Sequence, residues 1–211
     1  MCQRPGPVND ATLVQIVDAA LADATRRSGD WLACRPGCSQ CCIGVFSISQ
    51  LDAQRLRNGL AALTQTDAAR AARIRTRVAE SLARITPDFP GDAATGLLPE
   101  FAEPSAAAET FEAAFEDFAN DEPCPVLDPA TGTCDLYASR PMTCRTFGPP
   151  VMDDAGGLAV CELCFHGASA EEIAACTMHP DPDGMEEILT QELQQQTGAH
   201  GSTLIQFALR D

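Results

Sequence analysis

The chain has 211 residues, of which 45% are hydrophobic and only 5% aromatic, and its formal net charge at pH 7 is −16. This charge argues against nucleic-acid binding, because phosphate backbones are contacted by clustered cationic side chains. No stretch reaches the ~20 consecutive apolar residues that span a bilayer, and the N-terminus lacks the apolar segment of a secretory signal. The sequence therefore predicts a cytoplasmic protein with no membrane and no nucleic-acid partner.

The first 120 residues carry the apolar periodicity of amphipathic helices. Ser49 and Asp52 resemble a capping box at the start of one such helix. In another, Phe111, Phe115 and Phe118 form a single apolar stripe, which is the pattern of a buried helix face. We expect helices over about 10–27, 50–63, 67–85 and 105–119, and a long loop over the proline-rich stretch 86–104.

Beyond residue 120 the sequence consists of shorter segments rich in turn-forming residues. The turn-like stretch 128–133 has apolar residues on both sides, which predicts a small β-hairpin. A strand is predicted over 158–163, and there is no strand–helix alternation or internal repeat. Two further helices are predicted over about 169–178 and 183–196. We predict a mainly α fold with a small irregular cysteine-rich module that is built around a metal site.

Cysteines are the most informative residues of the chain. There are eleven, and four of them lie within nine residues: Cys34, Cys38, Cys41 and Cys42. Thiolate is a preferred ligand of zinc and of iron in sulfur clusters, and a reducing compartment disfavours disulfides. A second block follows downstream, at Cys124, Cys134, Cys144, Cys161 and Cys164. We therefore expect metal binding by thiols that come together from both blocks. The adjacent Cys41 and Cys42 diverge in extended backbone, so they serve two metals, or one of them ligates while the other packs or reacts.

The residues around these cysteines are similar to a known family. The first block reads Cys34-x3-Cys38-x2-Cys41-Cys42, followed by Ile48-Ser49 and Asp52. The second block reads Pro123-Cys124-Pro125-Val126-Leu127, then Cys134-x-Leu136-Tyr137-x2-Arg140-Pro141-x2-Cys144-Arg145-x-Phe147. Over roughly residues 34–164 the chain resembles the YkgJ-type cysteine-cluster family of zinc- or iron-chelating domains. The resemblance implies eight metal ligands: Cys34, Cys38, Cys41, Cys42, Cys124, Cys134, Cys144 and Cys161. Eight thiols fit two four-sulfur sites, or one cluster and one zinc.

The resemblance implies zinc or iron as the cofactor, with a [4Fe-4S] cluster as one form of the iron. Four thiolates on a divalent metal form an anionic site, which in an acidic chain needs cations nearby. Arg140 and Arg145 are the cations that we predict beside the cofactor; the alternative is that they form surface ion pairs with Asp135 or Glu162. The role of Cys164 stays open, and His166 is a candidate to replace a thiol ligand.

We expect a single domain over residues 1–211. The cysteine-cluster core occupies about 34–63 and 121–165, with a helical insertion over about 64–120 and a helical C-terminal extension over 166–211. The helices between 53 and 85 are rich in arginine, whereas residues 109–122 contain acidic residues and no basic one. These faces pair with each other or are solvated, or the arginines bind an acidic partner protein.

Three functions follow from these features. The first is a cytoplasmic metal-binding protein whose thiols chelate zinc or iron. The second is an iron–sulfur cluster enzyme, either an oxidoreductase or a methyl-transfer enzyme, since some relatives of the family resemble flagellin lysine-N-methylases. The third is metal storage or trafficking. A colourless protein with stoichiometric zinc favours the first function, and visible absorbance with acid-labile sulfide favours the second.

Overall fold

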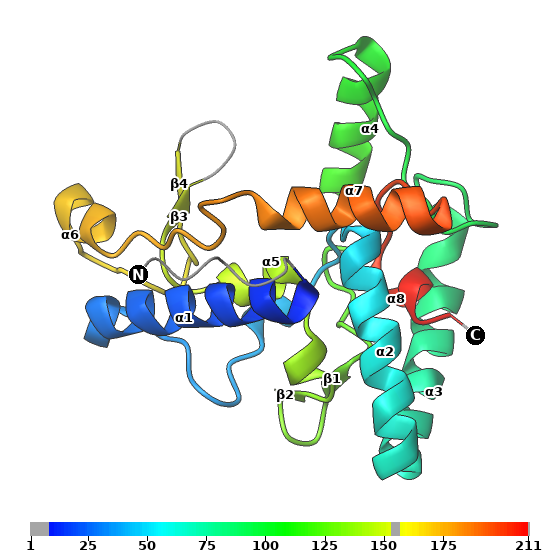
Figure 1. Ribbon diagram of the computed structural model, residues 1–211, viewed down its shortest axis with the longest axis horizontal. Helices are drawn as coiled ribbons and strands as arrows, with labels where there is room; N and C mark the ends of the chain where they lie inside the picture. Colours follow the sequence, from blue (N-terminus) through cyan, green and yellow to red (C-terminus); the bar gives the residue numbers. More distant parts are fainter. Residues whose placement is uncertain (1–8, 153–156, 211) are drawn as a thin grey trace, which may run out of the picture. The chain divides into compact units, whose positions relative to one another are not determined.

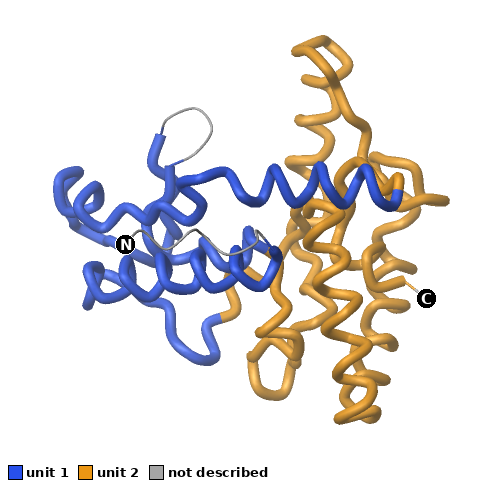
Figure 2. Tube along the Cα trace, viewed as in Figure 1, with its two compact units in different colours: residues 1–38, 142–197 blue, residues 39–141, 198–211 orange. Residues whose placement is uncertain are grey.

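The computed structural model describes residues 9–152 and 157–210. The chain forms two compact units, each assembled from segments that are distant in sequence (Figure 2). Unit 1 comprises Met1–Cys38 and Met142–Thr197, and unit 2 comprises Ser39–Pro141 and Gly198–Asp211. The boundary at Cys38 and Ser39 lies inside the first cysteine block, so the thiols of this block are divided between the units. The prediction of a single domain stays a prediction.

Unit 1 is built on α1 (Asp10–Ser28), which contacts α5 (Met142–Thr146) and α7 (Met185–Thr197) (Figure 1). Asn9 caps α1, because its side chain accepts a hydrogen bond from the Thr12 N–H at 3.0 Å. Leu13 and Val17 form the buried face of the helix. The smaller elements of unit 1 are the 3-10 turn η1 (Gly29–Trp31), the antiparallel strands β3 (Val151–Met152) and β4 (Leu158–Ala159), and α6 (Ala170–Ala175).

Unit 2 is built on a helical hairpin of α2 (Gln50–Thr66) and α3 (Ala68–Ile85), whose buried faces pack against each other (Figure 1). Ser49 caps α2 through the Asp52 N–H, and Asp67 caps α3 through the Arg70 N–H. The last short helix, α8 (Ile205–Ala208), is buried against both helices of the hairpin. The other elements of unit 2 are η2 (Gln40–Cys42), η3 (Thr86–Asp88), α4 (Ala106–Glu116), the antiparallel strands β1 (Leu127–Asp128) and β2 (Thr133–Cys134), and η4 (Tyr137–Ser139).

The core of unit 2 reaches the second cysteine block. Val126 and Leu136, which flank the β1–β2 hairpin, are buried in the cluster formed by Leu56 and Ile74 of the helical hairpin. A second cluster contains Phe89, Phe118 and Phe207. Phe111 and Phe115 of α4 are partly buried against this cluster. Phe118 lies beyond Glu116, where α4 ends, so the helix predicted over 105–119 is shorter in the structure. This packing fixes the hairpin, and with it Cys134, on the surface of the helices.

The mainly helical fold is confirmed, with one predicted β-hairpin at its expected place. The predicted strand over 158–163 is shorter in the structure, where only Leu158 and Ala159 pair with β3. The helices α5 and α8 were not predicted. No helix of the described residues has both the length and the apolarity that a membrane crossing requires.

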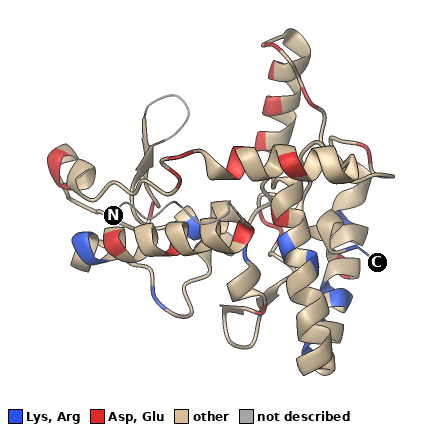
Figure 3. Ribbon diagram, in the orientation of Figure 1, with Lys and Arg blue, Asp and Glu red and all other residues tan. Residues whose placement is uncertain are grey.

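The arginines predicted as a binding surface for an acidic partner largely contact the chain's own acidic groups. Arg70 and Arg77 of α3 bind Asp135, and Arg84 binds Glu122 at 2.7 Å. Acidic residues lie along α4, whereas basic residues lie along α2 and α3 (Figure 3). An acidic protein partner stays a prediction.

Candidate metal centres

Four of the predicted ligands belong to unit 2, and its backbone brings them together from both cysteine blocks. The Cys124 N–H donates to the Cys42 carbonyl at 2.7 Å, and Ile43 pairs with Pro123 in an antiparallel bridge. Cys134 pairs with Leu127 across the hairpin, and the Leu127 N–H donates to the Cys124 carbonyl at 3.0 Å. Cys41, Cys42, Cys124 and Cys134 are therefore held on neighbouring stretches of backbone.

The sulfur atoms of this group act on one another electrostatically. Burial, with smaller contributions from the neighbouring Cys134 and Cys41, raises the pKa of Cys124 to about 12. A hydrogen bond with the Cys42 side chain, together with burial, raises the pKa of Cys41. Cys41 and Cys124 are therefore protonated at neutral pH in the absence of a metal, and a metal that binds them must displace their protons.

Backbone N–H groups point at two sulfurs of this group. Those of Val126 and Leu127 lower the pKa of Cys124, and that of Leu136 lowers the pKa of Cys134, although burial raises both values. Hydrogen bonds of this kind stabilise a thiolate rather than a thiol. The local backbone therefore favours the charged form that metals bind.

A second group of thiols belongs to unit 1, and it also combines the two blocks. The Ala33 N–H donates to the Cys164 sulfur at 3.4 Å, and the Phe165 N–H donates to the Trp31 carbonyl at 2.9 Å. Cys164 follows a turn in which its N–H donates to the Cys161 carbonyl at 2.9 Å. The segment before Cys34 therefore runs beside the segment 161–165.

The turn between Cys34 and Cys38 brings both residues to this group. The Cys38 N–H donates to the Arg35 carbonyl at 2.9 Å, and Gly37 has a φ of +92°, which favours glycine. Burial raises the pKa of Cys34 to about 12, with further contributions from Cys164, Cys161 and Cys38. The four sulfurs thus interact with one another, as those of unit 2 do.

The backbone at Gly148 lies close to the unit 1 thiols. A side chain at this position would begin 3.0 Å from the Cys34 sulfur, and Gly148 has a φ of +114°. Both the space and the backbone conformation therefore require glycine here. Cys144, four residues earlier, is half-buried in α5 of the same unit.

The thiols converge without forming a finished coordination sphere. Among residues 9–152 and 157–210, no three or more cysteine, histidine or acidic side chains stand close enough to hold a metal ion as they are placed. The donor set fits zinc or iron in its chemistry and in the number of thiols per unit, and closure requires the side chains to rotate.

The comparison with protein-family models identifies the family of this chain. Residues 33–164 match the model CxxCxxCC, described as "Putative zinc- or iron-chelating domain". The chain belongs to this family. Neither the comparison with curated proteins nor the comparison with solved structures found a match.

The zinc- or iron-chelating domain begins and ends within the unit 1 thiol group. Its first residue is Ala33 and its last is Cys164, and these two residues are joined by the hydrogen bond described above. The chain departs from the motif CxxCxxCC by one residue, since three residues instead of two separate Cys34 from Cys38. The Gly37 turn accommodates the additional residue.

The two predicted arginines have different surroundings. Arg140 lies 4.0 Å from the ring centroid of Tyr137, and it is close enough to Cys134 to lower the pKa of that thiol, which burial raises. Arg145 is 1% exposed and binds Asp18 of α1 at 2.7 Å. Arg140 therefore lies beside the unit 2 thiols, whereas Arg145 joins α5 to α1. Asp135, which the sequence offered as an alternative partner of these arginines, binds Arg70 and Arg77.

The remaining candidate residues differ in how far they are buried. Cys164, whose role the sequence left open, is 6% exposed and interacts with Cys34 and Cys161, while His166 is exposed. Cys176 is buried beside Phe165, as expected of a small apolar residue. Cys2 lies outside the described residues. The spacing Cys161-x2-Cys164 was the signal for Cys164 as a ligand, because two thiols on one turn can face one centre.

Proposed function

We propose that this protein chelates metal at two separate four-thiol sites, one in each unit. Cys41 and Cys42 lie in the 3-10 turn η2 and not in the extended backbone that the sequence prediction assumed, so both can ligate the same metal. Cys41, Cys42, Cys124 and Cys134 would hold one metal, and Cys34, Cys38, Cys161 and Cys164 the other. Cys144 stays a predicted ligand; it belongs to unit 1 and is not one of these four thiols. The supporting observation is that each group joins two thiols of the first block to two of the second within one compact unit.

Zinc is the metal that we propose for both sites, with a structural role. Both groups join irregular segments of the chain, which is the usual setting of closed thiolate zinc sites. Binding supplies folding free energy because it ties the 34–42 stretch to segments that lie more than 80 residues away in the sequence. A reducing cytoplasm, the proposed location, keeps the thiols available.

Metal and sulfide analysis tests the proposal. Protein purified without oxygen should contain about two zinc ions per chain, no acid-labile sulfide and no visible absorbance. Iron with a matching amount of sulfide would mean that the thiols hold an iron–sulfur cluster and not zinc. The search for function would then turn to redox or methyl-transfer substrates. Absence of any stoichiometric metal would contradict the chelation itself.

A further inference from the structure

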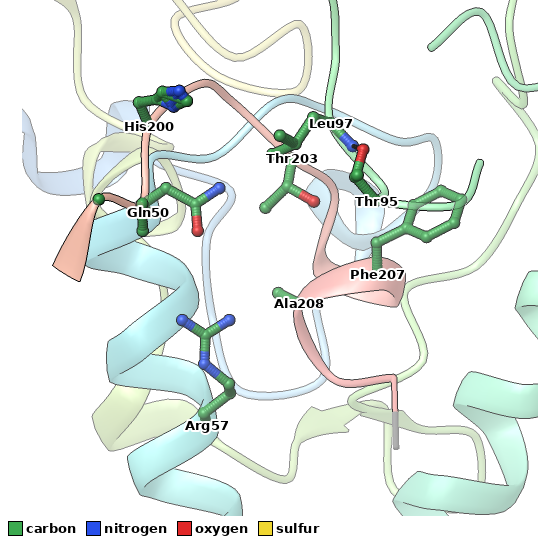
Figure 4. Close-up of a pocket in the computed structure, with 10 residues that line it drawn as sticks. Gln50, Arg57, Thr95, Leu97, His200, Thr203, Phe207 and Ala208 are labelled. Carbon is green, nitrogen blue, oxygen red and sulfur yellow. Dashed lines mark hydrogen bonds between the residues drawn. The ribbon is translucent and has the colours of Figure 1, made fainter. Parts of the chain in front are cut away.

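Unit 2 contains a hollow of about 220 Å³ that no cysteine lines. Arg57 of α2 points into it, facing Thr203 and Ala208, and Phe207 closes the far side (Figure 4). A second hollow of about 140 Å³ shares Arg57 and Ala208 with the first and contains Arg75 and Arg210. The walls of the first hollow are formed by Gln50, Arg57, Thr95, Leu97, Gly198–His200, Thr203, Phe207 and Ala208.

The charge of these walls is opposite to that of the chain. Although the chain carries 30 acidic residues and a net charge of −16, no described residue in either wall is acidic. Three arginines and His200 line the two hollows instead. An anion that the protein as a whole repels is therefore attracted locally.

Arg57 differs from most arginines of the described chain. Arg70, Arg77, Arg84 and Arg145 bind carboxylates, whereas Arg57 has no hydrogen-bond or ion-pair partner among the described residues. Arg57 is exposed as a residue, but partial burial of its guanidinium lowers its pKa, so this group loses some hydration without a compensating anion. A guanidinium of this kind is prepared for a bidentate oxyanion.

The walls around Arg57 are fixed by backbone pairing. Thr203 bridges Ile48 on one side and Leu97 on the other, and its hydroxyl donates to the Gly96 carbonyl at 2.7 Å. The Gln50 side-chain amide donates to the Gly201 carbonyl at 3.2 Å. Gly96 leaves room for the Phe207 ring, since a side chain there would begin 2.6 Å from the Phe207 Cβ. The hollow is therefore formed before any ligand arrives.

We propose that this hollow binds a small organic oxyanion, with its carboxylate or phosphate group on Arg57 and its apolar part against Leu97 and Phe207. The hollow is polar at the Arg57 side and apolar at the Phe207 side, which suits a molecule with one charged end. This binding site is independent of the thiol groups and needs no metal.

Ligand titration tests the site in the metal-loaded protein. Benzoate, phenyl phosphate and inorganic phosphate are titrated at constant ionic strength, with the melting temperature and isothermal calorimetry as readouts. We expect saturable binding of at least one aromatic anion, and binding that is at least about tenfold weaker in Arg57→Gln, because a charge-assisted hydrogen bond is lost. Comparing the affinities for benzoate and phenyl phosphate identifies the preferred charged group. Comparing phenyl phosphate with inorganic phosphate shows whether the apolar wall contributes.

Two further variants make the result specific. Arg73→Gln removes an exposed arginine of α3 outside both hollows and should bind like the parent protein. Ala61→Glu places a carboxylate one helical turn after Arg57, so it should compete with the ligand while preserving the helix. All variants should keep their metal content. No saturable binding, or equal weakening in Arg57→Gln and Arg73→Gln, would overturn the proposal.

Discussion

At the residue scale, Asp135 is the carboxylate that fixes the β1–β2 hairpin to α3. Its side chain is 2% exposed and accepts hydrogen bonds from Arg70 and Arg77, each at 2.5 Å. Arg77 also donates to the Pro125 carbonyl at 2.8 Å. Replacing Asp135 with Asn removes a buried charge between two guanidinium groups, so we expect the free energy of unfolding to fall by about 2 kcal/mol. Urea denaturation measures this change.

The exposed pair around Asp23 is the matched control. Asp23 binds Arg26 and Arg27 with half of its side chain in solvent. Because exposed ion pairs contribute little, Asp23→Asn should change the free energy of unfolding by less than about 0.5 kcal/mol. Equal effects of the two substitutions would show that burial of Asp135 is not what makes its pairs stabilising.

A second prediction at this scale concerns the fourth ligand of the unit 1 site. Cys164 contacts Cys34, whereas Cys144 is a ligand only by resemblance to the family pattern. We expect Cys164→Ser to remove about one of two metal equivalents, because serine oxygen replaces thiolate poorly on zinc. Metal analysis of the purified variant measures the loss. Cys176→Ser, a buried thiol on the same side of the unit, should keep both equivalents. If Cys144→Ser loses metal and Cys164→Ser retains it, then Cys144, and not Cys164, is the fourth ligand.

At the element scale, the contact between α2 and η4 depends on the absence of one side chain. A Cβ at Gly59 would lie 2.3 Å from the Ser139 Oγ and 2.5 Å from its Cβ. Alanine favours a helix by about 1 kcal/mol over glycine, yet overpacking costs about 1–3 kcal/mol. We therefore expect Gly59→Ala to lower the free energy of unfolding by about 1 kcal/mol, measured by thermal and urea denaturation.

The double variant separates this clash from other effects of Gly59→Ala. Removing the Ser139 side chain opens the space that the new methyl group needs, so Gly59→Ala with Ser139→Gly should show a favourable coupling energy of about 1 kcal/mol. If the two substitutions are simply additive, the close packing of α2 on η4 does not limit this position.

The elements also show how far the sequence predicts the fold. The helices predicted over about 10–27, 50–63 and 67–85 correspond to α1, α2 and α3, because each repeats its apolar period several times. Of their capping residues, only Ser49 was identified from the sequence. The helices α5 and α8 are only five and four residues long, so no period can be read from them. They exist because Met142 and Phe207 are buried by other elements, which is information that only the tertiary structure contains.

The candidate sites show the same limit. Sequence spacing identified the cysteines, since soft donors at turn-like intervals indicate metal binding. Their division into two groups follows from the unit boundary after Cys38 and from the pairing of Cys42 with Cys124, neither of which has a sequence signal. The hollow beside Arg57 was not predicted for the same reason, because its walls come from three distant stretches.

At the scale of the whole molecule, the two units differ in how much apolar core supports their thiols. The unit 2 thiols lie beside the large cluster formed by α2, α3 and α8. Among the described residues, the unit 1 thiols adjoin a small cluster around Phe165 and Cys176, in which Trp31 packs with a ring-centroid distance of 6.3 Å to Phe165. Burial of apolar area is the main favourable term in folding, so the unit 1 thiol region depends more on its metal.

Metal removal should therefore loosen the two units unequally. When a chelator strips the protein, we expect amide hydrogen exchange to accelerate by roughly tenfold or more in segments 31–38 and 161–176, while the α2 and α3 amides keep their protection. Hydrogen exchange with mass spectrometry, before and after chelation, measures this by segment. Restoring the metal should restore protection, which separates loss of the metal from irreversible damage. Equal acceleration in both units would mean that the apolar core of unit 2 does not hold its thiol site together without metal, and that both units rely on the metal alike.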